Sequence, residues 1–349
     1  MTNIALVGGG TAGHIMPNIA LLPELKKLFD SVIYIGTPDS MEQRICLTQN
    51  IPFYPTKATK FYRRKPWKNL SLPVTVIRGV KQAKQILKEK DISLVFSKGG
   101  YAAVPTVLAA HILGIPICCH ESDYTMGLAN RLTAPLSERV YTAFPNTYRK
   151  AVVRATPVRK EIFEGKRLEL FADQSKKTLL FMGGSLGAQA INEALSENYA
   201  ALSNKYNIIH VTGKGGMPLR TPTYHALPYA ENIQDLFQTA DLVVSRGGAS
   251  TLGELTALGK RVIVTPLPKG ESRGDQEQNA AYYRRLGLVN VLPQSALSGD
   301  TLVRVIDDII LKDAPAPAYE RETPKTIAEE LYAIAKMRNY PARKSAERR

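Results

Sequence analysis

The sequence predicts an α/β protein of two doubly wound domains, each a parallel sheet with helices on both faces. Short apolar runs alternate with amphipathic helical runs, and the pattern begins again near residue 177. The alternation loosens over 144–160, so the predicted domains cover 1–157 and 158–324. Because open α/β sheets bind ligands at the carboxyl ends of their strands, we expect the domains to face each other across a ligand-binding cleft.

The first half accounts for five strands and five helices. Strands are expected at 4–7, 32–35, 93–96, 115–119 and 139–141, and helices at about 15–29, 39–48, 74–89, 103–113 and 125–134. In the second half, strands are expected at 179–182, 207–211, 241–245, 261–264 and 288–291, and helices near 188–201, 231–239, 250–258, 275–286 and 300–311. After a proline-rich connector, a last helix is expected at 325–338, and 339–349 reads as a basic tail. Chain order leaves open which domain the last helix packs on.

Composition and charge indicate which partners and which classes of protein are expected. The formal net charge of +15 indicates an acidic partner, such as nucleic acid, anionic lipid or a phosphorylated substrate, or else a general bias toward Lys and Arg. No DNA- or RNA-binding signature is present, so no nucleic-acid partner is expected. The three cysteines form no CxxC pair, which argues against a zinc site or a disulfide framework. The chain has no apolar run of about 18 residues and no signal-peptide pattern, so a cytosolic protein without a membrane span is expected.

The stretch GGGTAGH at 8–14 lies between a predicted strand and a predicted helix. The free N–H groups of a helix start attract phosphate, and glycines allow close approach. Gly8, Gly10 and Gly13 match the dinucleotide pattern, so a dehydrogenase that uses NAD is the alternative of a different class. However, the second strand ends in Gly36-Thr37-Pro38 and not in the acidic residue that would bind a ribose.

The second domain contains three further loops of this kind. SRGGASTLGEL at 245–255 offers hydroxyls and N–H groups for a diphosphate, and Glu254 could bind sugar hydroxyls; the alternative is a helix-capping box. GGSLGAQ at 183–189 is either a second phosphate or base contact or simply a tight turn. The stretch 266–280 places Asp275 and Gln276 at a predicted helix start. There they could bind sugar hydroxyls; the alternative is an exposed charged loop in which Asp275 is only the N-cap.

Polar residues also gather at one edge of the first predicted sheet. SKGGY at 97–101 and HESD at 120–123 each follow a predicted strand, and His14 begins the first helix. Several phosphate-type loops, distributed over both domains, fit two phosphorylated substrates better than one dinucleotide.

These motifs resemble those of the MurG-like enzymes of glycosyltransferase family 28. GGGTAGH, SKGGY, HESD, TPVR at 156–159, GGSLGA, SRGGASTLGEL and DQEQNA at 275–280 occur in the family's order and span essentially the whole chain. The resemblance implies the GT-B fold and inverting transfer of N-acetylglucosamine from its UDP ester to the 4-hydroxyl of the muramoyl sugar of lipid I. It implies no cofactor, no metal, a peripheral location at the cytoplasmic face of the bacterial membrane, and protein partners in wall synthesis. A related transferase acting on another lipid acceptor, such as diacylglycerol, is the nearest alternative.

The resemblance also assigns residues. The donor-binding set is Thr11, Ala12, Gly13, Asp123, Arg159, Ser185, Ile233, Ala249, Ser250, Thr251, Glu254, Asp275 and Gln276. The acceptor-binding set is Gly10, Lys98, Gly99, Gly100 and Tyr101. A single in-line displacement needs a general base, and His14 is the first candidate because histidine titrates near neutrality. Asp123, which stands where many members carry Asn, is the second candidate.

The stretch KATKFYRRKPWKNL at 57–70 mixes cations with aromatic residues and holds the only Trp of the chain. Cations attract anionic headgroups, and aromatic rings favour the membrane interface. We therefore expect membrane contact through Phe61, Arg63, Arg64, Lys65, Trp67 and Leu70; the alternative is a solvated basic loop that grips the acceptor diphosphate.

Overall fold

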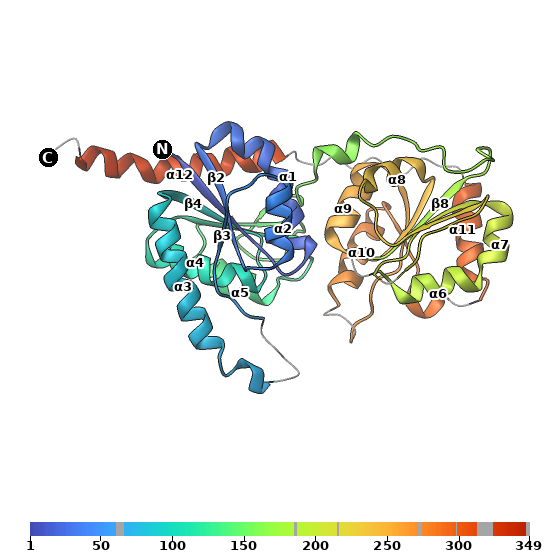
Figure 1. Cartoon of the computed structure of the whole chain (residues 1–349), viewed down its shortest axis with the longest axis horizontal. Helices are drawn as coiled ribbons and strands as arrows, with labels where there is room; N and C mark the ends of the chain where they lie inside the picture. The colour runs from blue at the N-terminus through green and yellow to red at the C-terminus, as the bar shows by residue number, and fades with distance from the viewer. Residues whose placement is uncertain are drawn as a thin grey trace. The chain divides into compact units, whose positions relative to one another are not determined.

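The computed structural model describes residues 1–60, 66–184, 187–214, 216–270, 274–297, 299–312 and 324–346. The chain divides into two compact units, Met1–Arg159 with Glu322–Arg349, and Lys160–Arg321. Figure 1 shows a sheet flanked by helices in each unit. The division after Arg159 lies two residues beyond the position expected from the sequence.

The first unit contains a parallel sheet in the order β3-β2-β1-β4-β5-β6-β7. Its strands are β1 (Asn3–Val7), β2 (Ser31–Gly36), β3 (Phe53–Pro55), β4 (Ile92–Ser97), β5 (Ile117–Glu121), β6 (Arg139–Thr142) and β7 (Val152–Val153). Every residue of β1 and β5 is buried, as expected for central strands with helices on both faces.

Helices cover both faces of the first sheet. They are α1 (Ala12–Leu28), α2 (Met41–Thr48), α3 (Leu72–Glu89), α4 (Val104–Ile112), α5 (Leu128–Thr133) and α12 (Pro324–Ala346). One core cluster joins β1, β2 and β4 to α1 and α12, and a second joins the opposite face of the sheet to α3 and α4. Ile327, Leu331 and Ile334 of α12 lie in the first cluster, so the last helix packs on the first unit (Figure 1).

The second unit repeats this architecture. Its sheet has the order β10-β11-β9-β8-β12-β13-β14, parallel except for the β10–β11 pair. The strands are β8 (Thr178–Met182), β9 (Asn207–Val211), β10 (Leu219–Arg220), β11 (Tyr224–Leu227), β12 (Leu242–Ser245), β13 (Arg261–Val264) and β14 (Asn290–Val291). The helices are α6 (Gln189–Glu197), α7 (Tyr199–Lys205), α8 (Ile233–Thr239), α9 (Ala249–Ala257), α10 (Asp275–Arg285) and α11 (Thr301–Leu311).

Each sheet has a point where the strand order reverses. In the first unit it lies between β1 and β4, and in the second between β8 and β12. Ligands of open α/β sheets bind at such points, outside the carboxyl ends of the strands. The four loops that follow these strands are all glycine-rich, so the sheet topology brings two pairs of sequence motifs together.

Two expectations need correction. The helix expected over 188–201 is two helices, α6 and α7, which meet at Asn198. Much of the stretch 339–349, expected to be a tail, is helical, because α12 continues through Ala346. Pro341 removes one backbone donor without ending α12, just as Pro17 and Pro23 lie inside α1.

Candidate functional site

The glycine loops of the first unit interlock through their backbones. Gly10, Gly99 and Gly100 have φ angles of +87°, +84° and +80°, which favour glycine. A Cβ on Gly100 would lie 2.3 Å from the carbonyl oxygen of Gly9, and one on Gly10 would lie 2.8 Å from the ring of Tyr101. The loops after β1 and β4 therefore form one rigid surface that tolerates no side chain at these positions.

His14 lies in the first turn of α1 and contacts this surface. Its Nδ1 lies 3.1 Å from the carbonyl oxygen of Gly9 and 3.1 Å from Oγ1 of Thr11. A carbonyl oxygen only accepts, so the Gly9 contact requires a proton on Nδ1. This tautomer leaves Nε2 as the acceptor atom of the ring, as a general base requires.

Lys98, which the resemblance assigns to acceptor binding, lies in the interior of the first unit. Its side chain is buried, with Nζ 2.6 Å from Nδ1 of His120 and 2.7 Å from Oγ of Ser122. Burial lowers the pKa of the Lys98 ammonium to about 7, although Glu121 and Asp123 oppose this shift. Lys98 therefore connects β4 to the loop after β5 inside the first unit, and its ammonium is not exposed at the surface of the unit.

His120 shares the same interior. Its Nε2 lies 3.1 Å from the carbonyl oxygen of Arg154, so Nε2 carries the proton and Nδ1 accepts from Lys98. Burial, reinforced by the Lys98 charge, lowers the pKa of His120 well below its usual value. His120 is thus a neutral connection between β5 and the segment after β7.

Asp123 lies on a loop that Glu121 holds in place. The buried Glu121 carboxylate accepts hydrogen bonds from the Asp123 N–H, the Gly127 N–H and the Asn130 amide, at 3.1, 2.9 and 3.0 Å. Asp123 itself is half-buried. The two candidate bases come from different segments of the first unit, His14 from the first turn of α1 and Asp123 from the loop after β5.

A hollow of about 510 Å³ opens between the glycine loops of the second unit. It brings together the loops after β8 and β12, the segment after β13 and the start of α10; its lining includes Gly183, Gly184, Gly187, Gln189, Arg246, Gly248, Thr251, Leu267, Gln276 and Gln294. Apart from the neighbouring residues along the chain, no atom of the described residues lies within 4 Å of where a Cβ on Gly184 or Gly248 would be. These loops face open space that a ligand can fill.

The start of α9 excludes the capping-box alternative. The helix begins at Ala249 with Gly248 as its N-cap, so in the described part of the chain neither Ser250 nor Thr251 occupies the cap position. Ser250, Thr251 and Glu254 are half-buried, with Thr251 on the hollow. The first N–H groups of α9 thus remain for a ligand.

The start of α10 gives a similar result. Gly274, with a φ of +81°, occupies the N-cap position, so Asp275 is the first helical residue and not the cap. Gln276 lines the hollow, and its Oε1 accepts a hydrogen bond from the Leu267 N–H at 2.9 Å. The loop after β13 is therefore tied to α10 through a predicted donor-binding residue.

Arg246 and Gln294 are among the residues of the hollow that were missed from the sequence. Nη1 of Arg246 donates to Oε1 of Gln294 at 2.7 Å and to the carbonyl oxygen of Thr265 at 3.2 Å. The position of Arg246, directly after β12 in the SRGG stretch, was the available signal. Gln294 lies 48 residues further along the chain, and no motif marks it.

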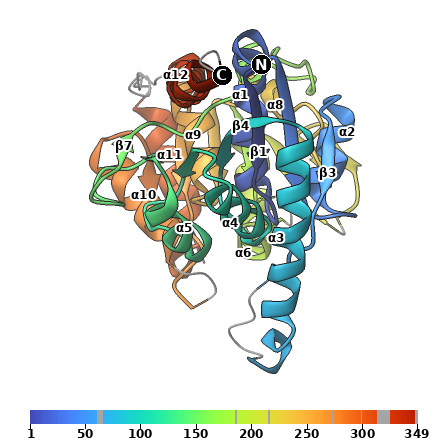
Figure 2. The ribbon, with the colours of Figure 1, turned by 90° about the vertical axis from the view of Figure 1, so that its left-hand side faces the viewer.

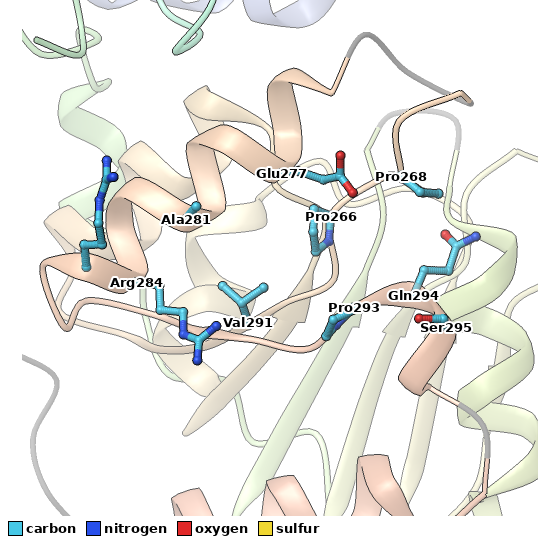
Figure 3. Close-up of a pocket in the computed structure, with 10 residues that line it drawn as sticks. Pro266, Pro268, Glu277, Ala281, Arg284, Val291, Pro293, Gln294 and Ser295 are labelled. Carbon is cyan, nitrogen blue, oxygen red and sulfur yellow. The ribbon is translucent and has the colours of Figure 1, made fainter. Parts of the chain in front are cut away.

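A second hollow, of about 810 Å³, also has Gln294 in its lining (Figure 3). Glu277, Ala281 and Arg284 come from one face of α10, and Pro266, Pro268 and Pro293 come from the segments after β13 and β14. It contains none of the predicted site residues.

The other predicted residues lie elsewhere or outside the described part. Ile233 begins α8 and Arg159 ends the first unit, and neither lines the 510 Å³ hollow. Thr11, Ala12 and Gly13 form the start of α1. Ser185, Phe61, Arg63, Arg64 and Lys65 lie outside the described residues. Trp67 and Leu70 are described, and their side chains are exposed.

Comparisons with known proteins agree with this geometry. The sequence model of the glycosyltransferase family 28 N-terminal domain matches residues 4–142, and that of the glycosyltransferase family 28 C-terminal domain matches residues 178–337. A relative from Clostridium botulinum strain Hall is 42% identical over 321 residues, which cover 88% of this chain and 90% of the relative. A relative from Clostridium novyi strain NT is 38% identical over 320 residues, with the same coverage. Both are named UDP-N-acetylglucosamine–N-acetylmuramyl-(pentapeptide) pyrophosphoryl-undecaprenol N-acetylglucosamine transferase.

A solved structure leads to the same family. The crystal structure of Acinetobacter baumannii MurG superposes with a TM-score of 0.72 at 26% identity, and the match covers 95% of this chain and 99% of that one. The predicted fold class, two parallel-sheet α/β domains of the GT-B type, is confirmed. The chain belongs to glycosyltransferase family 28.

Proposed function

We propose that this protein transfers N-acetylglucosamine from UDP-N-acetylglucosamine to the 4-hydroxyl of the muramoyl sugar of lipid I, forming lipid II. The observation that carries the proposal is the hollow between the loops after β8 and β12, where uncapped helix starts face open space. This is a nucleotide-diphosphate site by its chemistry, and the names of the relatives supply the sugar and the acceptor.

The second unit binds the donor. The diphosphate lies at the start of α9, where the N–H groups of Ala249 and Ser250 and the hydroxyl of Thr251 face it. Ser185 adds a hydroxyl, Ile233 contacts the base, and Glu254 binds the ribose. Asp275 and Gln276 hold hydroxyls of the transferred sugar. Arg246 is positively charged and lines the hollow, so it stabilises the diphosphate as well.

The first unit binds the acceptor and carries the base. The backbone around Gly10, Gly99 and Gly100 receives the acceptor diphosphate, beside Tyr101. Nε2 of His14 takes the proton of the acceptor hydroxyl as its oxygen attacks the anomeric carbon and the bond to UDP breaks. The helix start and Arg159 stabilise the leaving UDP. Asp123 is the second candidate for the base.

We also propose that the first unit touches an anionic membrane surface from the cytoplasmic side. Trp67, Leu70, Val74 and Ile77 are exposed by 63, 83, 50 and 68%. Val74 and Ile77 lie three residues apart on one face of α3, and Trp67 in the turn η1 (Pro66–Asn69) and Leu70 directly precede this helix. The N-terminal part of α3 extends beyond the sheet of its unit (Figures 1 and 2). Among the described residues, no helix is long and apolar enough to span a bilayer.

The activity is tested by UDP release from UDP-N-acetylglucosamine, with and without a short-chain lipid I analogue, followed by the mass of the product. We expect release that depends on the acceptor and a product heavier by one N-acetylhexosamine. Release without acceptor dependence, or transfer to diacylglycerol instead, would contradict the proposed acceptor.

The base is tested by His14→Ala, with His111→Ala as the control because His111 lies exposed on α4. We expect kcat to fall by about 10²–10⁴ in the first variant only, with UDP affinity unchanged. A loss of UDP affinity with an unchanged kcat would instead make His14 a donor-binding residue.

Membrane contact is tested by sedimentation with phosphatidylglycerol vesicles at low and high salt. A variant combining Trp67→Ala with Arg63→Gln, Arg64→Gln and Lys65→Gln should lose most of its binding, whereas Leu311→Ala should not. Leu311 is a suitable control because it is 81% exposed in the second unit. Equal binding of both variants would move the contact to another surface.

A further inference from the structure

Side chains hold three successive carbonyl groups of the first glycine loop. The Val7 oxygen accepts from Nδ2 of Asn18 at 3.2 Å, the Gly8 oxygen from the Tyr34 hydroxyl at 2.6 Å, and the Gly9 oxygen from Nδ1 of His14 at 3.1 Å. Asn18 and Tyr34 are fully buried beneath the loop, whereas His14 is half-buried beside it. The loop is therefore fixed from behind by groups that no substrate touches.

The direction of the Tyr34 hydrogen bond follows from its neighbours. Burial raises the pKa of the Tyr34 phenol far above its usual value, so the hydroxyl keeps its proton. Nδ2 of Asn18 donates to the same hydroxyl oxygen at 3.3 Å, which leaves the phenolic proton for the Gly8 carbonyl. The Gly8 carbonyl consequently has a donor of fixed position on β2.

The next peptide group is confined as well. A Cβ on Gly9 would lie 2.5 Å from Oε1 of the buried Glu42, and the Gly9 oxygen is close to Gly100. The position of the Gly9 oxygen thus follows from the position of the Gly8 peptide, and this oxygen is the hydrogen-bond acceptor that sets the orientation of the His14 ring.

We propose that Tyr34 is a positioning residue for the transfer reaction. Its hydroxyl fixes the Gly8 carbonyl, and through the adjoining Gly9 carbonyl it keeps the His14 ring in the Nδ1–H tautomer and in the orientation needed for proton abstraction. The inference rests on the proposed function of His14 and extends it to a buried residue that touches neither substrate.

The chain offers a matched control for a role in packing. Tyr34 on β2 and Tyr141 on β6 are both fully buried and belong to the same core cluster. Only the Tyr34 hydroxyl reaches the glycine loop. Replacing either tyrosine by Phe removes one hydroxyl and keeps the ring. A difference in kcat between the two variants therefore reports on the contact of the Tyr34 hydroxyl with the glycine loop.

The experiment compares Tyr34→Phe with Tyr141→Phe in the full-length protein, using UDP-N-acetylglucosamine and a short-chain lipid I analogue. We expect kcat to fall about tenfold in Tyr34→Phe, with KM for the donor and UDP affinity unchanged, because a misplaced catalytic group costs rate and not binding. The acid limb of the pH–rate profile should move in this variant alone. The concentration of folded enzyme is taken from UDP titration, so a loss of stability does not imitate the effect.

A double-mutant cycle with His14→Ala shows whether Tyr34 acts through His14. Tyr34→Phe should change kcat by less than twofold in the His14→Ala background. An unchanged kcat in Tyr34→Phe, an equal loss in Tyr141→Phe, or the full tenfold loss in the His14→Ala background would each overturn the inference. A wild-type protein without acceptor-dependent transfer would instead overturn the proposed function, so the two failures are distinguishable.

Discussion

The glycine loops of the two units occupy equivalent positions in similar sheets, yet their surroundings are opposite. Behind the loop after β1 lie the buried polar side chains of Asn18, Tyr34 and Glu42, and in front of it lies the loop after β4. The loops after β8 and β12 instead border a hollow of about 510 Å³. We call the first pair filled because it is packed from behind by buried side chains, and the second pair open because it borders a hollow at Gly184 and Gly248, although Gly183 and Gly187 are packed about as closely as Gly100.

This difference suits the two pairs of glycine loops to different functions. An open pair can receive a phosphate on its N–H groups, and this suits a substrate that binds and leaves. A filled pair cannot change shape without breaking buried hydrogen bonds, and this suits a group such as His14, whose orientation must stay constant. We infer that the first unit contributes rigidity to the reaction and the second contributes affinity for the nucleotide.

The largest expected difference is in stability, when one methyl group is added to a glycine of each pair of loops. In Gly100→Ala the new Cβ would lie 2.3 Å from the Gly9 oxygen at a φ of +80°, so we expect the free energy of unfolding to fall by about 3 kcal/mol. In Gly248→Ala the φ is −69° and the space is open, so we expect a change below about 1 kcal/mol. Urea unfolding of both variants measures the difference.

UDP binding by the same two variants should show the opposite order of effects. Gly248→Ala places its methyl group in the hollow and should weaken UDP binding, whereas any folded Gly100→Ala protein should bind UDP as the wild type does. Equal losses of stability in the two variants would show that the described difference between the loops has no energetic consequence.

The sequence predicted what depends on periodicity and on motifs. The central strands and most helices follow from alternating apolar runs, and the glycine loops follow from their residues. The edge strands β3, β7 and β10 were missed because two or three residues are too few to show a pattern. The strand β11, with four residues, was missed as well. The burial of Lys98 was missed because it depends on His120 and Ser122, which lie more than 20 residues away. Tyr34 and Gln294 carry no motif, so only the fold connects them to a loop.

An intermediate effect is expected in the pH dependence of stability. The folded Lys98 has a pKa of about 7 and the unfolded one about 10.5, so between these values the unfolded chain holds more protons and stability rises with pH. Lys98→Met should remove up to about 1.4 kcal/mol of this rise per pH unit above pH 7. Unfolding of the wild type and the variant in urea at pH 7, 8 and 9 measures it.

In the second unit, a buried histidine makes stability depend on pH in the acid range instead. Burial lowers the pKa of His210 from 6.5 to about 4, so the unfolded chain holds more protons between these values and stability falls as pH falls. His210→Gln should reduce the pH dependence in this acid range and leave the range above pH 7 unchanged. A Lys98→Met variant whose pH dependence parallels that of the wild type above pH 7 would show that the pKa of the folded Lys98 is not lowered.

The last comparison concerns one ion pair in each unit. In the first, Nη2 of Arg154 lies 2.5 Å from Oε1 of Glu330 on α12, and the two side chains are only 22 and 23% exposed. In the second, Nζ of Lys205 lies 2.6 Å from Oδ2 of Asp307, but Lys205 is 52% exposed. Because solvent screens the second pair more strongly, Arg154→Met should cost about 1–3 kcal/mol and Lys205→Met less than about 1 kcal/mol.

Calorimetry of both variants measures these costs, with Glu330→Gln as a further test that the loss comes from the pair and not from the arginine alone. A cost that appears in Arg154→Met but not in Glu330→Gln would assign the effect to other contacts of Arg154. A cost shared by both would show that α12, which returns to the first unit from the far end of the chain, is held there by charge as well as by its apolar face. The filled unit would then owe part of its rigidity to the last helix of the chain.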